Sequence, residues 1–180
     1  RRFSDFDEYQ KDIIKNCSSI SIFSGPLQPA IMGASIASAK IHLSDEIDTL
    51  QNDLFEKMFF FTQTAKKYNI PIVCDALTPI FFIAIGNQNV SCKLSIHLQN
   101  EGFYCMNTVF PAVPVKNSGL RLTVTNHNTL QDIDGILSCI ADALPKFMKE
   151  EDYSYEQIYK AFKMVNPNSD SETELQRKIA

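Results

Sequence analysis

The chain has 180 residues, of which 44% are hydrophobic and 21% are charged. Its formal net charge of −4 argues against nucleic acid as the main partner, because phosphate binding requires a concentrated basic surface. No apolar run reaches the roughly 18 residues that a bilayer-spanning helix needs, so we expect no membrane partner.

The cysteines and histidines indicate neither a disulfide framework nor a metal centre. The five cysteines are scattered, and no two of them form a Cys-x-x-Cys pair. The three histidines are also far apart in the sequence, so we expect no metal site. The first segment, RRFSDFDEYQ, lacks the apolar core of a signal peptide. These features favour a cytoplasmic protein with reduced thiols.

Two helices are expected near the start of the chain. Apolar residues recur at helical spacing over residues 5–16, and the alternation over 19–23 is typical of a short extended segment. Pro29 suits the first turn of a second helix, which continues to about His42. Its side chains are small and apolar, so that another helix or domain could approach closely. A helix buried in its own domain is the alternative.

A long amphipathic helix is predicted next. Ser44 is a suitable N-cap, and acidic residues follow in the first turn, where the helix dipole favours anions. Apolar residues then repeat every three or four positions up to Lys67. The bulky, phenylalanine-rich end of this helix predicts a core against a sheet rather than a cofactor pocket.

The middle of the chain predicts a sheet. We expect strands at 79–86, 103–110 and 120–125, a helix at 89–100, a loop at 111–119, and a helix from Thr129 to about Lys149. Thr129 and Asp132 resemble a capping box for the last of these helices. The order predicts an α+β fold, in which a small, mostly antiparallel sheet carries helices packed on one face.

Four segments carry the most specific pattern. They are IFSGPLQPA (22–30), TPIFFIAIGN (78–87), LQNEGFYCMNTVFPAVP (98–114) and GLRLTVTNHNTLQDID (119–134). In this order they resemble the C-terminal part of pyridoxal-phosphate (PLP) enzymes of the α-oxoamine synthase type, which include amino-oxononanoate and serine-palmitoyl synthases. The stretches FSGPLQP (23–29) and FPAVP (110–114) resemble bacterial proteins of the synthetase-like, class II aminotransferase kind. The resemblance covers about residues 5–148.

The resemblance implies a fold-type I architecture and a division of the chain. Residues 1–43 would be a segment crossing from the large, cofactor-carrying domain, and residues 44–149 would be the C-terminal α+β small domain. The composition turns polar after Lys149. We expect residues 150–180 to form an arm with one weak helix near 154–165 that packs loosely or is partly disordered.

The family's cofactor lysine is missing from this sequence. In the family it lies in a Ser-Lys or His-Lys motif, and the chain contains no Ser-Lys, Thr-Lys or His-Lys pair. Without a Schiff-base amine the cofactor has no covalent anchor. We therefore expect PLP in the full-length protein, none bound to this chain alone, and a C-terminal fragment that is inactive by itself.

Arg121 is the candidate substrate-binding residue. In the family, an arginine of the motif R-L-R-(I/L)-T binds the carboxylate of the amino-acid substrate, and many members carry two arginines there. Gly119 holds the first of these positions here. A planar guanidinium matches a carboxylate bidentately and stays charged. The alternative for Arg121 is a surface arginine paired with a nearby acid.

Two further residues are implied at the cofactor. Ser24 would contact the PLP phosphate of the neighbouring subunit, and Gly25 would donate its backbone N–H to that phosphate. The alternative for Ser24 is a cap on the helix that begins near Pro29. His127 follows the last strand, as in relatives, and we favour a loop or capping role over that of a general base.

The expected function is that of a part of a PLP-dependent acyl-CoA:amino acid C-acyltransferase, which joins an acyl thioester to an amino acid with loss of carbon dioxide. An aminotransferase is a close variant. A stand-alone, non-catalytic α+β module that binds a ligand or partner is a different possibility, and so is a pseudoenzyme subunit that stabilises an active partner. A homodimer is implied, with the helix at 30–41 as a candidate interface.

Overall fold

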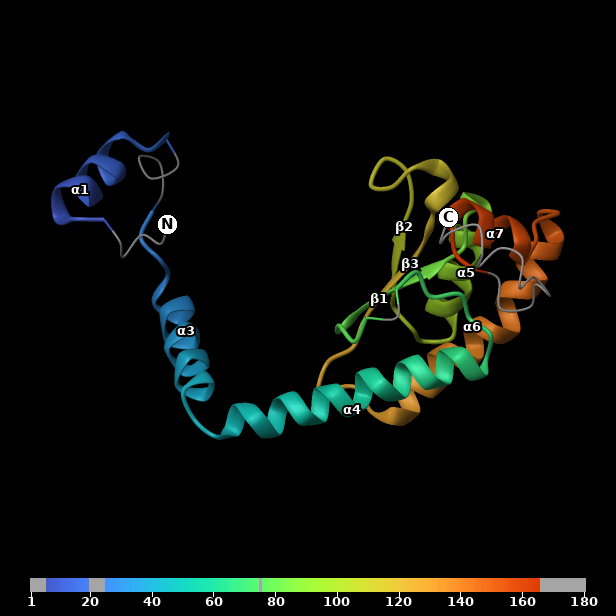
Figure 1. Cartoon of the computed structure of the whole chain (residues 1–180), viewed down its shortest axis with the longest axis horizontal. Coiled ribbons are helices and arrows are strands. Elements are labelled where there is room, and N and C mark those ends of the chain that lie inside the picture. The colour runs from blue at the N-terminus through green and yellow to red at the C-terminus, as the bar shows by residue number, and fades with distance from the viewer. Residues whose placement is uncertain (1–5, 20–24, 75, 166–180) are drawn as a thin grey trace, which may run out of the picture. The chain divides into compact units, whose positions relative to one another are not determined.

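The computed structural model describes residues 6–19, 25–74 and 76–165 (Figure 1). The element order is α1 Glu8–Cys17, α3 Pro29–His42, α4 Glu46–Lys67, β1 Ile80–Ala84, α5 Gln88–Asn100, β2 Met106–Thr108, the 3₁₀ helix η2 Val115–Asn117, β3 Gly119–Thr123, α6 Leu130–Glu150 and α7 Tyr155–Phe162. The chain divides into two compact units, unit 1 (Arg1–Ile47) and unit 2 (Asp48–Ala180). Within the described ranges, no helix is both long enough and apolar enough to cross a membrane.

Unit 1 contains the two helices expected at the start of the chain. Asp7 caps α1 by accepting a hydrogen bond from the backbone N–H of Gln10 at 2.7 Å. Pro29 occupies the first turn of α3, where its missing N–H is not needed. The hydroxyl of Ser44, which we expected to cap α4, instead donates to the carbonyl oxygen of Ile41 at 2.9 Å. Short polar side chains often bond the preceding turn in this way.

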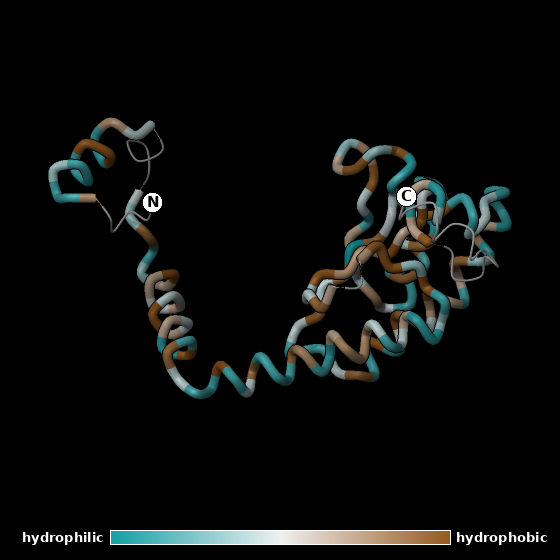
Figure 2. The backbone as a smooth tube through the Cα atoms, in the orientation of Figure 1, coloured by the Kyte–Doolittle hydropathy of each residue, from teal (hydrophilic) through white to brown (hydrophobic). Residues whose placement is uncertain are grey.

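No residue of α3 is buried within unit 1. Ile31, Met32 and Ile36 are each about half exposed, at 49%, 48% and 57%. In Figure 2 the tube of α3 shows hydrophobic residues along much of its length. A helix that is apolar on all sides is usually covered by other polypeptide.

Unit 2 is built on a three-stranded antiparallel sheet of order β1-β3-β2. β3 lies in the centre, and the register pairs Phe82 with Arg121 on one side and Met106 with Arg121 on the other. The predicted strand at 103–110 is shorter than expected, since β2 covers only Met106–Thr108. The small antiparallel α+β sheet predicted from the sequence is confirmed.

The inner face of the sheet is the core of unit 2. Phe81, Ile83, Leu120 and Leu122 alternate along β1 and β3 and are all buried. Each such burial contributes about 1.5–3 kcal/mol. The ring of Phe61 from α4 stacks on Phe81 at a centroid distance of 3.9 Å, and α5 packs against β2, β3 and α6.

The expectation of loose packing is wrong for α7. Ser154 and Gln157 form a capping box at its start, and Ile158 and Tyr159 are buried. The polar composition of the segment hid these two side chains, which are enough to anchor a helix of 8 residues. The boundaries of the three predicted segments, 1–43, 44–149 and 150–180, stay a prediction.

Gly119 is required by the close approach of β1 and β3. A Cβ atom at this position would collide with the backbone carbonyl oxygen of Ile83 and would lie 2.5 Å from Cε1 of Phe82. We predict that Gly119→Ala lowers the free energy of unfolding by about 1–3 kcal/mol, as overpacking does. Chemical denaturation of the 180-residue chain measures this effect.

Gly33→Ala is the matched control, because a Cβ there meets no atom within 4 Å. It should leave the stability unchanged or slightly higher. Equal unfolding curves for Gly119→Ala and the wild type would contradict the packing described for β1 and β3.

Candidate functional site

One row of three side chains crosses the three strands on the outer face of the sheet. Because the register pairs Arg121 with both Phe82 and Met106, these three residues lie side by side on the same face. Arg121 is exposed, whereas its neighbours in sequence, Leu120 and Leu122, are buried on the inner face. The three strands contain no other charged residue.

Arg121 has no polar partner among the residues that the structure describes. No hydrogen bond or ion pair of its guanidinium is found there, and its cross-strand neighbours Phe82 and Met106 are apolar. Met106 and Ile80 are 52% and 51% exposed. The arrangement is thus a lone cation on a partly exposed apolar surface, which can accept an anion without first breaking another ion pair.

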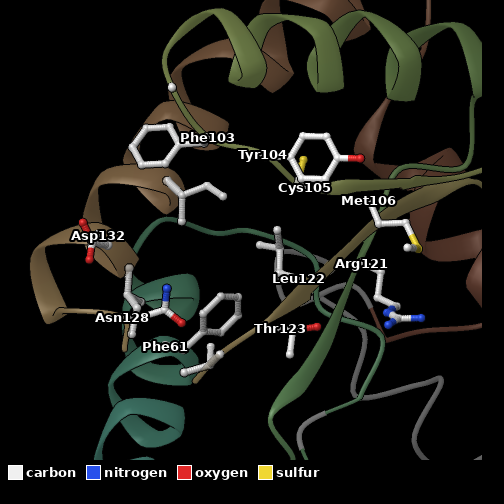
Figure 3. Close-up of a pocket in the computed structure, with 14 residues that line it drawn as sticks. Phe61, Phe103, Tyr104, Cys105, Met106, Arg121, Leu122, Thr123, Asn128 and Asp132 are labelled. Carbon is white, nitrogen blue, oxygen red and sulfur yellow. The ribbon is translucent and has the colours of Figure 1, made fainter. Parts of the chain in front are cut away.

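A cavity of about 470 Å³ borders this row at the place where the chain before β2 separates from β3. Its walls include Phe61, Phe103, Cys105 and Leu122. Figure 3 shows Arg121 and Met106 at one end of the cavity residues and Asp132 at the other. The guanidinium in this view points away from Asp132, so the two opposite charges are not joined.

Asp132 is part of the predicted capping box, which is confirmed. Its carboxylate accepts hydrogen bonds from the backbone N–H and the hydroxyl of Thr129, both at 2.8 Å. These two bonds lower the pKa of Asp132. His127 is exposed in the preceding loop and takes no part in the cap. The carboxylate of Asp134 accepts a hydrogen bond from the hydroxyl of Tyr68 at 3.1 Å.

The implied cofactor-binding residues belong to unit 1. Ser24 lies outside the described residues. Gly25 is exposed, and a Cβ added to it would meet nothing within 4 Å. No cluster of three or more metal-ligating side chains occurs within residues 6–19, 25–74 and 76–165.

Comparisons with known proteins find relatives for part of this chain. No protein-family model matches the chain. The 8-amino-7-oxononanoate synthase of Thermoanaerobacter pseudethanolicus is 30% identical over 116 residues, which are 64% of this chain and 29% of that protein. The enzyme of the same name from Trichlorobacter lovleyi is 27% identical over 132 residues, covering 72% of this chain and 33% of its own length.

Solved structures agree with the sequence relatives. The 8-amino-7-oxononanoate synthase of Francisella tularensis superposes with a TM-score of 0.63 at 21% identity, covering 81% of this chain and 41% of that one. A serine palmitoyltransferase variant from S. paucimobilis with bound PLP-myriocin aldimine gives a TM-score of 0.68 at 15% identity, over 77% and 34%. The chain has an α-oxoamine synthase-like fold. It spans about 30% of the length of the curated relatives it matches.

The close packing at Gly119 bears on which arginine of the resembling motif this sheet can hold. The resemblance places the first of two family arginines at this position, but the backbone of β1 and the ring of Phe82 leave no room for a side chain there. With this strand pairing, the sheet has room for the side chain of Arg121 but for none at residue 119.

Sequence patterns did not reveal the residues that fix the loop after β3. The side-chain amide of Asn126 donates to the carbonyl oxygen of Leu50 at 2.9 Å. Lys57 donates to the carbonyl oxygen of Asn126 at 2.7 Å and to the carboxylate of Asp53 at 2.8 Å. These bonds tie α4 to the chain that leaves Arg121's strand, across a sequence separation too long for local pattern analysis.

Asp132 makes the stability of the fold depend on pH. Its folded pKa is lowered, so the stability from its ionised form is fully present above the unfolded pKa of about 3.9 and is lost as pH falls through the folded pKa. We predict that Asp132→Asn lowers the melting temperature at neutral pH, and that the difference from wild type shrinks below about pH 4.

Asp142→Asn, an exposed change on the same helix, is the control and should show no such pH dependence. Thermal melts between neutral pH and the acid range measure both variants. A melting-temperature difference for Asp132→Asn that is the same at every pH would contradict the capping role.

Proposed function

We propose that this chain is the substrate-binding C-terminal part of a PLP-dependent acyl-CoA:amino acid C-acyltransferase, in which Arg121 binds the carboxylate of the amino acid. The observation that carries the proposal is the exposed Arg121 on the open sheet face, with no polar partner among the described residues. The similarity to 8-amino-7-oxononanoate synthases supports the choice of enzyme class.

The surroundings of Arg121 suit a carboxylate that becomes covered when the substrate binds. A guanidinium offers two parallel N–H donors in the plane of a carboxylate. Phe82 and Met106 lie on either side of it in the register, so the cross-strand neighbours of a bound carboxylate would be apolar. A charge-assisted hydrogen bond in such a place is worth about 1.5–3 kcal/mol.

The residues near Arg121 do not fit a covalent PLP site. No lysine lies in the three strands or lines the cavity beside Arg121. Of the lysines elsewhere in the described chain, Lys11, Lys57 and Lys93 are engaged in ion pairs. We propose that PLP, which would supply the electron sink for the reaction, is held by polypeptide outside this sequence, with Ser24 and the N–H of Gly25 at its phosphate.

We also propose that the complete enzyme is a cytoplasmic homodimer that takes an amino acid and an acyl thioester and does not bind nucleic acid. The exposed apolar side chains of α3, including Ile31, Met32 and Ile36, support contact with a further polypeptide surface. An aminotransferase would use Arg121 in the same way, since its substrates carry the same carboxylate.

A stand-alone ligand- or partner-binding module is the second candidate. It is favoured by unit 2, which closes a core of its own around Phe81, Leu94 and Leu137. A module of this kind would bind a carboxylate at Arg121 without turnover.

We predict that Arg121→Ala in the complete enzyme raises the KM for the amino acid by about tenfold to a hundredfold, because it removes hydrogen bonds to a charged group. The absorbance of bound PLP should stay the same. Arg121→Lys keeps the charge without the planar fork and should fall between wild type and Arg121→Ala. An unchanged KM would remove Arg121 from the site.

We predict that the 180-residue chain mixed with PLP keeps no internal aldimine absorbance after dialysis, since it contains no Ser-Lys, Thr-Lys or His-Lys pair of the kind that holds the family's cofactor lysine. Absorption spectroscopy before and after dialysis measures this. A band that survives would mean that a lysine of this chain anchors the cofactor.

A further inference from the structure

The ring of Phe82 is confined on two sides. On one side lies Gly119, where the position of a Cβ atom would be 2.5 Å from Cε1 and 2.9 Å from Cζ of the ring. On another side lies the ring of Phe162 from α7, at a centroid distance of 6.1 Å and an interplanar angle of 46°. Phe82 therefore fills the space that a side chain at residue 119 would need.

The backbone of Phe82 is fixed as well. It pairs with Arg121 in the antiparallel ladder, and its carbonyl oxygen accepts a hydrogen bond from the N–H of Val73 at 3.0 Å on the other edge of β1. The backbone of Phe82 thus stays opposite Arg121 unless β1 itself moves.

α7 is tied to the strand that carries Arg121. The side-chain amide of Asn117, two residues before β3, donates to the carbonyl oxygen of Ala161 at 3.1 Å. Ile158 anchors the helix in the core with no exposed surface. The end of the described chain is therefore connected to the Arg121 row through the contacts of Phe162 with Phe82 and of Phe82 with Gly119.

We propose that Phe82, held by Phe162, is a specificity-determining residue that restricts the Arg121 site to ligands with one carboxylate on an apolar group. The inference rests on the proposed function, because it takes Arg121 to bind a carboxylate. Phe82 and Gly119 keep a second cation out of position 119. A second negative charge on the ligand would lie against Phe82, Met106 or Ile80 and lose its hydration without a partner. An apolar substituent would instead be covered by these side chains.

The test uses the 180-residue chain and three probes: acetate, hexanoate and the dicarboxylate adipate. The chain has four arginines, so that the side-chain N–H signal of Arg121 is assigned in an NMR spectrum by its loss in Arg121→Gln. We expect hexanoate to bind about five- to tenfold more tightly than acetate, as burial of one or two methylene groups implies. We expect adipate to bind no more tightly than acetate.

Phe82→Leu and Phe162→Leu should bring the affinities for hexanoate and acetate to within about twofold of each other. A leucine offers no flat ring against which the alkyl chain of hexanoate can pack. Acetate binding should persist in both. Phe147→Leu removes a different ring contact, the one between Phe147 and His97, and should leave the ratio as in wild type. If Phe162→Leu no longer gives the NMR spectrum of a folded protein, Phe82→Leu alone tests the role of Phe82 in the preference for hexanoate.

The outcomes separate the two proposals. No response of Arg121 to any probe would contradict carboxylate binding itself, and with it the specificity. Binding of all three probes with equal affinity, or a preference that survives in a folded Phe82→Leu variant, would overturn the role of Phe82 while leaving Arg121 as the carboxylate-binding residue.

Discussion

The antiparallel register of β3 between β1 and β2 is the constraint on which the rest of unit 2 depends. It sets Leu120 and Leu122 against the core and Arg121 on the open face. A slip of one residue would turn the guanidinium into the apolar core and expose both leucines. Because an unpaired buried charge costs several kcal/mol, the alternation of Leu-Arg-Leu fixes both the sheet and the position of the one charge in it. Fold and candidate site therefore have the same physical origin.

Features far apart in the sequence hold this register in place. Phe61 stacks on the inner face of β1, and Asn126 with Lys57 ties the loop after β3 to α4. At the other end of β3, Asn117 connects the strand to α7. Gly119 allows β1 and β3 to approach so closely that a side chain is excluded. These contacts make the outer face a rigid platform, on which the surroundings of Arg121 are set before any ligand arrives.

Local patterns predicted the elements well and the long-range contacts poorly. The helices of unit 2, the buried strand at 79–86 and the capping box of Thr129 and Asp132 follow from periodicity and from short-range hydrogen bonding. The hydroxyl of Ser44 donates to the preceding turn at Ile41, which the capping pattern does not predict. The packing of α7 depends on two buried side chains in a segment whose composition is polar, so composition does not reveal it. Arg121 was singled out by its place in an alternating strand and by a family resemblance. Phe82 was not, because its role arises from a cross-strand glycine and a ring some 80 residues away.

The most direct test of a free, anion-binding Arg121 is its reactivity toward phenylglyoxal, followed residue by residue with mass spectrometry. We predict that Arg121 is modified about as fast as an arginine in an unstructured peptide, since no described residue pairs with it, and that hexanoate slows the modification at this residue alone. Resistance of Arg121 without any added carboxylate would mean that its guanidinium is already engaged. Rapid modification that hexanoate does not slow would mean that the open face of the sheet is not a carboxylate site.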